Sequence, residues 1–565
     1  MRNWSAAVFP PQQYKNRKKS AVGIYKEKSL PPGISIVLVL LAFFVVFQPW
    51  NLEMRELTRL EGLFAAEALE LEAGNGGVVS AHGAVIHNSF PLYPFFVRMV
   101  YSLGGVSMEM AMRLVSLVML GITAVLVYFA AASNRTGRAG IVAAAMYIGT
   151  NLVIEKGIDG NPATTTALAL LGAHLLLFQF GFRKSNWSLA WILALFVITL
   201  GFFTGGFLAV VYFVFPIFFL RRPLSVKSKF AKPGFWLGIL FFAGVVARWG
   251  AASWDMAHKL PFQMTWWGQE GLWDYFKTIL AFPFELPVRL LPWSFIAWLP
   301  FCAALQALDK TPIFSRFLRT LTFSNLALIW LLPRSDFRDI IYIIGPLSIL
   351  TGISYDIGVR RYGQKVRKWL LLGEWVILVM VAGILLLCFA PERYLELFAS
   401  MKNGIDFSRT VSYLPVACVT IALLMCCYLL LRFGRFTLPV WLMLLTLSCS
   451  YGLFFNVVQQ HYRAQNRQHS KFGMRIRTAL EKEPPAVLYK YGIVGLYSEL
   501  YYSGCKVIQL QSLSELPQHE PVVYVLCTEF PQVPTREWSN LLPKETDGKM
   551  PDLMLWKGVS RQTLL

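Results

Sequence analysis

Long apolar runs separated by short polar stretches make up the first 457 residues of the chain. Many of these runs approach the roughly 20 residues that an α-helix needs to cross the hydrocarbon core of a bilayer. The pattern predicts an all-α polytopic membrane protein of about thirteen transmembrane helices, with 91–104 as a candidate short or re-entrant helix. The expected spans are 32–49, 109–132, 139–154, 161–181, 187–203, 207–220, 234–250, 291–308, 321–333, 339–355, 369–390, 411–431 and 437–457.

The composition supports a membrane protein. Only 15% of the residues are charged, against about 25% in soluble domains. The chain contains 18 Trp and 22 Tyr residues, two residue types that are enriched at the headgroup level of a bilayer. A net charge of +21 would suggest nucleic acid as the partner of a soluble protein. Here the positive charge lies mainly in short loops that orient helices, so no nucleic-acid partner is expected.

The distribution of Lys and Arg predicts the orientation of the chain in the membrane. With a cytoplasmic N-terminus, the inside segments hold 26 Lys and Arg in 85 residues, and the outside segments hold 13 in 136. An excess of Lys and Arg, as in these inside segments, is typical of cytoplasmic loops. No small-residue cleavage site follows Trp50, so the first span should be retained. We expect a multi-pass protein of the cell inner (plasma) membrane, with its C-terminus periplasmic or otherwise extracytoplasmic.

The polarity pattern divides the chain into three parts. Residues 1–30 form a basic cytoplasmic N-terminus, and residues 31–457 form the membrane domain, with outside loops 50–108 and 251–290. Residues 458–565 contain short apolar runs alternating with helical patches, which predicts a small extracytoplasmic α/β domain. The apolar runs are 486–491, 506–510, 522–527 and 553–557.

Cys505 and Cys527 in this domain could pair in a disulfide.

Carboxylates and arginines are concentrated directly after the first span. Glu53, Glu56, Arg59 and Glu61 follow it within a dozen residues. Glu56 and Arg59 are three positions apart, so a helical turn places both on one side. The stretch is either half of an active site or a surface helix with solvated charges.

Three further polar clusters fall on the predicted outside face. Asp159 either caps the helix that follows Pro162 or faces the first loop. Loop 251–290 is rich in Trp, including Trp266 and Trp267, and is either an interfacial belt or a platform for a sugar or lipid. The last cluster, Arg334 to Asp339, contains two arginines.

The arginines of the last cluster are Arg334 and Arg338. Two arginines at a membrane surface favour phosphate binding, and the alternative is internal pairing with Asp336 and Asp339. An enzyme that moves a sugar from a polyprenyl phosphate needs a carboxylate for the acceptor and cations for the departing phosphate. The outside loops supply both.

The order of these motifs resembles that of the membrane-embedded C-type glycosyltransferases of family 39. This family includes bacterial aminoarabinose transferases acting on lipid A and the protein O-mannosyltransferases. The resemblance covers roughly residues 32–355. The matching elements are Glu56-Leu-Thr-Arg59 with the helix to Glu67, Phe90-Pro-Leu-Tyr93, Met112-Arg113-Leu-Val-Ser116, Asp159, Pro292-Trp293-Ser294 and Phe337-Arg338-Asp-Ile-Ile-Tyr342.

The resemblance implies transfer of a sugar, with inversion, from a polyprenyl-phosphate donor to an extracytoplasmic lipid, glycan or protein. It points to lipid A modification or protein glycosylation in the cell envelope. The family carries an Asp-Glu pair where this chain has Glu56-Leu57. This departure leaves the acceptor carboxylate open among Glu53, Glu56 and Glu61.

The implied site residues fall into three groups. Glu56 and Asp159 are the catalytic candidates. Arg59, Arg334 and Arg338 are the candidates for the donor phosphate. Lining of the substrate cavity is expected from Glu53, Glu61, Tyr93, Trp266 and Trp267.

No cofactor is expected beyond the lipid-linked donor. A divalent metal is possible but not indicated, because the loops contain no His cluster. Two other functions stay open: a transporter or flippase of lipid-linked sugars, and a non-catalytic membrane assembly protein. The few polar residues within the expected spans favour chemistry at the surface over a translocation path.

Overall fold

A computed structural model gives the fold of the chain. It describes residues 30–53, 55–71, 79–85, 89–257, 272–332, 337–389, 439–456, 468–481, 487–493, 495–542 and 553–560. Most of the described chain is helical, as the apolar pattern predicts.

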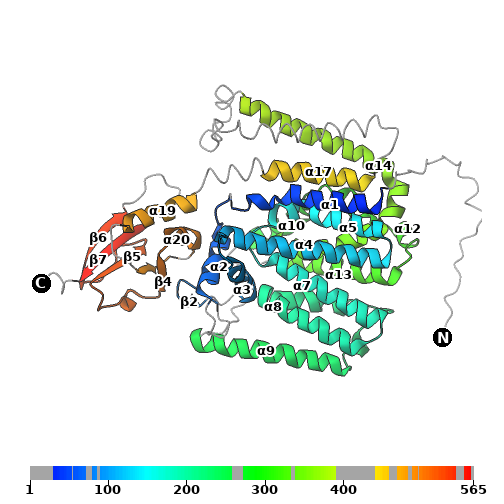
Figure 1. The fold of residues 1–565 in the computed structure, drawn as a ribbon. Coiled ribbons are helices and arrows are strands. Elements are labelled where there is room, and N and C mark those ends of the chain that lie inside the picture. The colour runs from blue at the N-terminus through cyan, green and yellow to red at the C-terminus, as the bar shows by residue number, and fades with distance from the viewer. Residues whose placement is uncertain are drawn as a thin grey trace, which may run out of the picture.

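A bundle of apolar helices forms the larger part of the protein (Figure 1). Apolar side chains that face outward, such as Val37, Leu40 and Phe129, are more than half exposed, as expected for helices that meet lipid. The helices of the bundle are α1 (Pro32–Phe47), α4 (Met108–Asn134), α5 (Gly137–Gly149), α6 (Asn151–Lys156), α7 (Ala163–Leu176), α8 (Trp187–Phe218), α9 (Pro233–Ala257), α10 (Leu272–Arg289), α11 (Ser294–Ala297), α12 (Ala303–Gln306), α13 (Pro312–Leu331), α14 (Ile341–Phe389) and α17 (Val440–Phe454).

Six helices in the described part of the chain are long and apolar enough to cross a membrane, and a bent pair of helices could make a seventh. This supports a multi-pass membrane protein, while the expected count of thirteen spans is not confirmed. The expected span 411–431 lies outside the described residues. The expected span 291–308 is instead a series of short helices, which begins at a bend of 104° after α10.

The two spans expected at 187–203 and 207–220 form one element, α8, with a break inside it. Gly206 has a φ of 66°, outside the helical region, and an added Cβ would lie 2.3 Å from the ring of Phe90. Only glycine fits at this position. Any other residue would be strained at this φ, and its side chain would have no room beside Phe90.

The centre of the bundle is α5. Its side chains are buried from Ala139 to Gly149, and it packs mainly against α4 and α14. Small residues allow this close approach: a Cβ added to Gly352 on α14 would lie 2.3 Å from the Ala139 carbonyl oxygen. Small residues at helix contacts are typical of membrane bundles, because they bring backbones together.

A five-stranded sheet forms near the C-terminus. Four of its strands coincide with the four apolar runs, whereas the strand Arg536–Leu542 lies outside them. The order of the sheet is β4-β3-β5-β7-β6. The first three strands are parallel, β7 is antiparallel to β5, and β6 is antiparallel to β7. Cys505 and Cys527 are both free thiols, so the pairing considered from the sequence does not form. The elements are α19 (Gln468–Leu480), β3 (Val487–Tyr491), α20 (Tyr497–Ser503), β4 (Lys506–Leu510), β5 (Val522–Cys527), β6 (Arg536–Leu542) and β7 (Met554–Ser560).

We refer to α19, α20 and the five strands as the C-terminal unit. It lies beyond one end of the bundle, with the segment between α1 and α4 next to it (Figure 1). That segment, residues 52–107, is called the first loop. It contains α2 (Arg59–Glu70), a hairpin of β1 (Ser80–Ala81) and β2 (Ala84–Val85), and α3 (Leu92–Tyr101).

Candidate active site

Four buried charged side chains meet where the first loop contacts the bundle. The Arg55 guanidinium lies 2.9 Å from Asp159 and 3.1 Å from Glu61. Arg113, on α4, lies 3.2 Å from Glu61. We call Arg55, Glu61, Arg113 and Asp159 the charge cluster. Its two arginines balance its two carboxylates, as buried charges require.

Glu61 is positioned by the start of α2. Thr58 precedes the helix, and a capping box joins the two residues, with the Glu61 carboxylate accepting the Thr58 amide at 2.8 Å. The Gly160 amide also donates to Glu61, at 2.7 Å. Gly160 lies too close to Met112 for any side chain, because an added Cβ would be 2.9 Å from it. The cap and this glycine fix Glu61 between the two loops.

Arg113 holds the first loop against α4. Its guanidinium donates to the carbonyl oxygens of Leu52, Arg55 and Glu56, as well as to Glu61. Planar guanidinium groups suit such multiple acceptors. The sequence signal for this role is an arginine in the first turns of an otherwise apolar span.

The cluster keeps Glu61 ionised. Burial by itself would raise the pKa of Glu61, but Arg113 and Arg55, with the amides of Thr58 and Gly160, hold this pKa well below its usual range. Burial opposes the charge of Arg55 too, yet Glu61 and Asp159 raise its pKa. Both oxygens of Glu61 are thus engaged, and the residue is suited to anchor the loop rather than to exchange a proton.

Asp159 connects the cluster to two further cations. Lys156 lies 3.6 Å from its carboxylate and Arg338 lies 4.0 Å away. Asp159 itself is buried, while the side chains of Lys156 and Arg338 are 29% and 22% exposed. Two cations on one buried carboxylate, both partly open to solvent, form a place where an anion can bind.

The alternative role considered for Asp159, capping of the following helix, is performed by another residue. The Asn161 side chain accepts the amide of Ala163, the first residue of α7, at 2.9 Å. The Asp159 carboxylate instead faces Arg55 in the first loop. The backbone carbonyl of Asp159 accepts the Ser116 hydroxyl at 2.8 Å, which ties the loop to α4.

Other candidates from the sequence lie apart from the cluster. The half-buried carboxylate of Glu56 accepts the Ser470 amide of α19 at 3.0 Å. Exposed Glu53 accepts the Ser107 hydroxyl at 2.9 Å. Tyr93 is fully buried and donates to the Met112 carbonyl, so it belongs to a packed core rather than to an open cavity.

Four candidates cannot be placed in the site. Arg59 is the first residue of α2, and its side chain lies outside the described part of the structure. Arg334, Trp266 and Trp267 also lie outside the described residues. Conversely, sequence reasoning did not single out Arg55, Arg113 or Lys156 as site residues.

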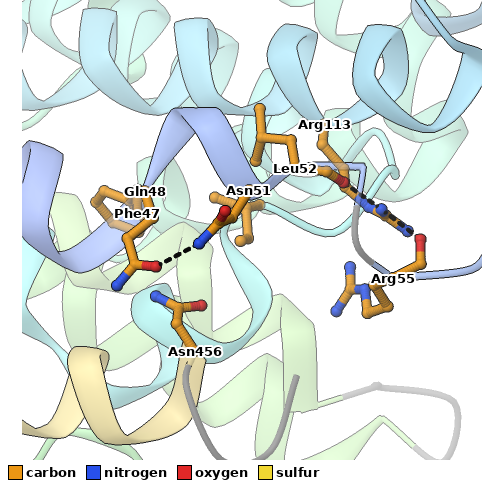
Figure 2. A pocket seen from close by; sticks show the side chains of 8 residues that line it. Phe47, Gln48, Asn51, Leu52, Arg55, Arg113 and Asn456 are labelled. Atoms are coloured by element: carbon orange, nitrogen blue, oxygen red, sulfur yellow. Dashed lines mark hydrogen bonds between the residues drawn. The ribbon is translucent and has the colours of Figure 1, made fainter. Parts of the chain in front are cut away.

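The two cluster arginines also line a small pocket (Figure 2). Its polar wall consists of three amide side chains, two of which are joined by a hydrogen bond of 2.8 Å from Asn51 to Gln48. The third, Asn456, donates to the Val46 carbonyl at 2.6 Å. The lining residues are Phe47, Gln48, Asn51, Leu52, Arg55, Arg113, Ile158 and Asn456.

Glu155 belongs to a separate ion pair. Its carboxylate lies 3.0 Å from Arg289 on α10 and accepts the Tyr451 hydroxyl of α17. Within the described residues, no group of three His, Cys, Asp or Glu side chains could hold a metal ion.

Comparison with known proteins supports the resemblance inferred from the motifs. Residues 87–250 match the family model described as dolichyl-phosphate-mannose-protein mannosyltransferase. The fold matches ArnT from Cupriavidus metallidurans in the apo state, with a TM-score of 0.68 and 15% identity over 93% of this chain and 98% of that one. No curated protein matches the sequence.

The same ArnT has been solved bound to undecaprenyl phosphate. That structure matches with a TM-score of 0.67 and 15% identity over 94% of this chain and 98% of that one. At this level of identity the match shows the fold. Together with the family model, it confirms the resemblance to membrane-embedded C-type glycosyltransferases.

Proposed function

We propose that this chain, which resembles the membrane-embedded C-type glycosyltransferases in its fold and over residues 87–250, is itself such an enzyme. Its donor is a polyprenyl-phosphate sugar, and its acceptor is an extracytoplasmic lipid, glycan or protein. The transfer proceeds with inversion at the anomeric carbon.

The arrangement of Lys156 and Arg338 around Asp159 is the observation that carries this proposal. Both cations contact one buried carboxylate and are themselves partly exposed. Asp159 also pairs with Arg55 of the first loop, so the two cations lie on the carboxylate that joins the first loop to the bundle. A phosphate with two negative charges can be held by two such cations while Asp159 keeps them in place.

The reaction needs little more than positioning and charge stabilisation. An acceptor oxygen forms a bond to the anomeric carbon as the bond from that carbon to the phosphate oxygen breaks. The electron pair of the broken bond stays on the departing polyprenyl phosphate, where Arg338 and Lys156 stabilise it. Such electrostatic groups typically contribute about 3–4 kcal/mol each to lowering a barrier.

Glu56 is the best candidate to receive the acceptor proton. Of the first-loop carboxylates that the sequence left open, Glu61 is buried with both oxygens bonded, whereas Glu56 is only half-buried. Glu56 directly follows Arg55 of the charge cluster in the sequence, while its carboxylate accepts the Ser470 amide of α19. A general base has to be reachable by the group that it deprotonates.

A transfer assay with radiolabelled polyprenyl-phosphate sugar on membranes tests the proposal. We expect Arg338→Ala and Lys156→Ala each to lower transfer about 100-fold or more. Arg477→Ala is the matched control, because Arg477 is exposed and pairs with the equally exposed Glu481 at the surface. Glu56→Gln should also abolish transfer, and full activity of this variant would remove Glu56 from the mechanism.

The same assay separates the alternatives. Sugar on an acceptor indicates an enzyme, whereas donor that crosses the membrane without product indicates a transporter. Absence of both in membranes that contain folded protein would support an assembly role and would overturn the proposal.

A further inference from the structure

The C-terminal unit contacts the first loop immediately beside the charge cluster. Three successive residues, Glu56, Leu57 and Thr58, are bonded to it. The Glu56 carboxylate accepts the Ser470 amide at 3.0 Å. The Leu57 amide donates to the Tyr502 hydroxyl at 2.9 Å, and the Thr58 carbonyl accepts the Ser498 hydroxyl at 2.7 Å.

Glycines allow the helices at this contact to approach closely. A Cβ added to Gly62 on α2 would lie 2.4 Å from the backbone nitrogen of Ser498 on α20. A Cβ added to Gly473 on α19 would lie 2.3 Å from the Glu499 carbonyl oxygen. The helices α2, α20 and α19 therefore pack with their backbones in contact, and the interface leaves no space for a shift.

The other end of α2 is attached to the same unit through the β1–β2 hairpin. Glu70, the last residue of α2, accepts the Gly83 amide at 3.0 Å and also the His82 amide. The His82 ring stacks on Tyr497 with ring centroids 5.0 Å apart. The His82 carbonyl accepts the Gln509 amide of edge strand β4 at 2.7 Å.

Tyr502 joins three parts of the protein. Its hydroxyl accepts from Leu57 in the first loop and donates to Glu109 in the first turn of α4, both at 2.9 Å. One helical turn later on α4, Arg113 binds the carbonyl groups of Leu52 and Arg55. The segment 52–57 thus lies between Arg113 on the bundle side and Tyr502 on the side of the C-terminal unit.

We infer that the C-terminal unit is a positioning element that holds residues 55–62 in place for the chemistry at Asp159, with Tyr502 as its central residue. The inference rests on the proposed function for the reaction concerned, but the contact itself can be measured without it. A shift of about 1 Å in such a segment can cost about 100-fold in rate.

Hydrogen exchange and transfer measured on the same full-length protein in detergent test this inference. In Tyr502→Phe, the amides of residues 55–62 should exchange about tenfold faster, because the Leu57 amide loses its acceptor. The turnover number should fall about tenfold, while the affinity for undecaprenyl phosphate, used as the probe, stays unchanged.

Tyr501→Phe is the matched control. Tyr501 is the neighbouring residue on α20 and packs edge to face on Tyr502, with ring centroids 5.2 Å apart. Among the described residues, its hydroxyl makes no hydrogen bond. Exchange and turnover should both remain at the values of the unaltered protein. Ser498→Ala, which removes the bond to the Thr58 carbonyl, gives a second and independent variant.

The possible outcomes are distinct. Unchanged exchange of residues 55–62 in both Tyr502→Phe and Ser498→Ala would overturn the inference. So would a higher acceptor KM with unaltered turnover and exchange, since this would make the unit an acceptor-binding domain. If the unaltered protein transfers no sugar but Tyr502→Phe still accelerates exchange, the proposed function is wrong. The inference that the C-terminal unit holds residues 55–62 in place is then still supported.

Discussion

Arg55 donates a hydrogen bond of 2.9 Å to Asp159, a residue 104 positions further along the chain. The bond joins the first loop to the short segment between α6 and α7, and both partners are buried. Through Asp159, it also links the first loop to the partly exposed cations Lys156 and Arg338. The carboxylate is therefore the point at which three segments of the chain are held together.

Replacement of Asp159 tests whether its carboxylate holds Lys156 and Arg338 in place for transfer, apart from any effect on folding. In Asp159→Asn, Lys156 and Arg338 lose the charge that holds them, and we expect transfer to fall about 100-fold or more. Asp309→Asn is the matched control, because Asp309 bonds the Thr311 amide at the start of α13 and Asn can do the same. Both proteins should be compared at equal yield of folded material. Normal transfer by Asp159→Asn would exclude the anchoring role.

Glu61 should matter chiefly for stability. Glu61→Gln leaves Arg55 and Arg113 buried with one compensating carboxylate fewer, which should cost about 3–5 kcal/mol of unfolding free energy. Denaturant titration in detergent measures this cost. Glu481→Gln, at an exposed i,i+4 pair with Arg477, should change the free energy by less than about 0.5 kcal/mol. Equal stability of the two variants would contradict the buried pairing.

Glu67 should make stability depend on pH. Burial raises the pKa of Glu67 to about 8, with the Ser89 hydroxyl opposing the shift and Glu70 adding to it. A free glutamate titrates near 4.5. Between these values the folded protein holds a proton that the unfolded chain has lost, so stability falls as pH rises from about 4.5 to 8.

The variant Glu67→Gln tests the effect of this proton. Gln resembles the protonated acid and can still bond Ser89, so the variant should lose most of this pH dependence. At pH 8 it should be more stable than the unaltered protein by about 1–2 kcal/mol. Melting temperatures from pH 5 to 8.5 measure the difference, and parallel curves for the two proteins would count against it.

Replacing Gly62 or Gly244 by Ala distinguishes two effects on stability: loss of a close packing contact, and the higher helix propensity of Ala. In Gly62→Ala, the new methyl group collides with the Ser498 backbone, and we expect a loss of about 2 kcal/mol or more together with reduced transfer. Gly244→Ala on α9 meets no atom within 4 Å and should stabilise its helix by up to about 1 kcal/mol. Thermal unfolding of the two variants measures both effects. Destabilisation of both variants, or of neither, would refute the close contact between Gly62 and Ser498.

The helical membrane fold and the C-terminal sheet could be predicted from the sequence. A bilayer requires about 20 apolar residues per span, so α1 and α4 are recognisable from their residues alone. The strands β3, β4 and β5 coincide with short apolar runs. The break in α8 could not be predicted, because it depends on one φ value at Gly206 and on the ring of Phe90 beside it.

The sequence also singled out Asp159 and Arg338, since a carboxylate for the acceptor and an arginine for a phosphate are expected in the outside loops of such an enzyme. It favoured Glu56 as the acceptor carboxylate but left the choice among Glu53, Glu56 and Glu61 open, because a periodic pattern shows which residues share a side but not what that side faces. Only the tertiary structure turned Glu61 toward Arg55 and Arg113, and Glu56 toward α19. Burial and pairing of these charges depend on contacts such as Arg113 with Glu61, 52 positions apart, and Glu56 with Ser470, 414 positions apart, and these form only when the chain folds.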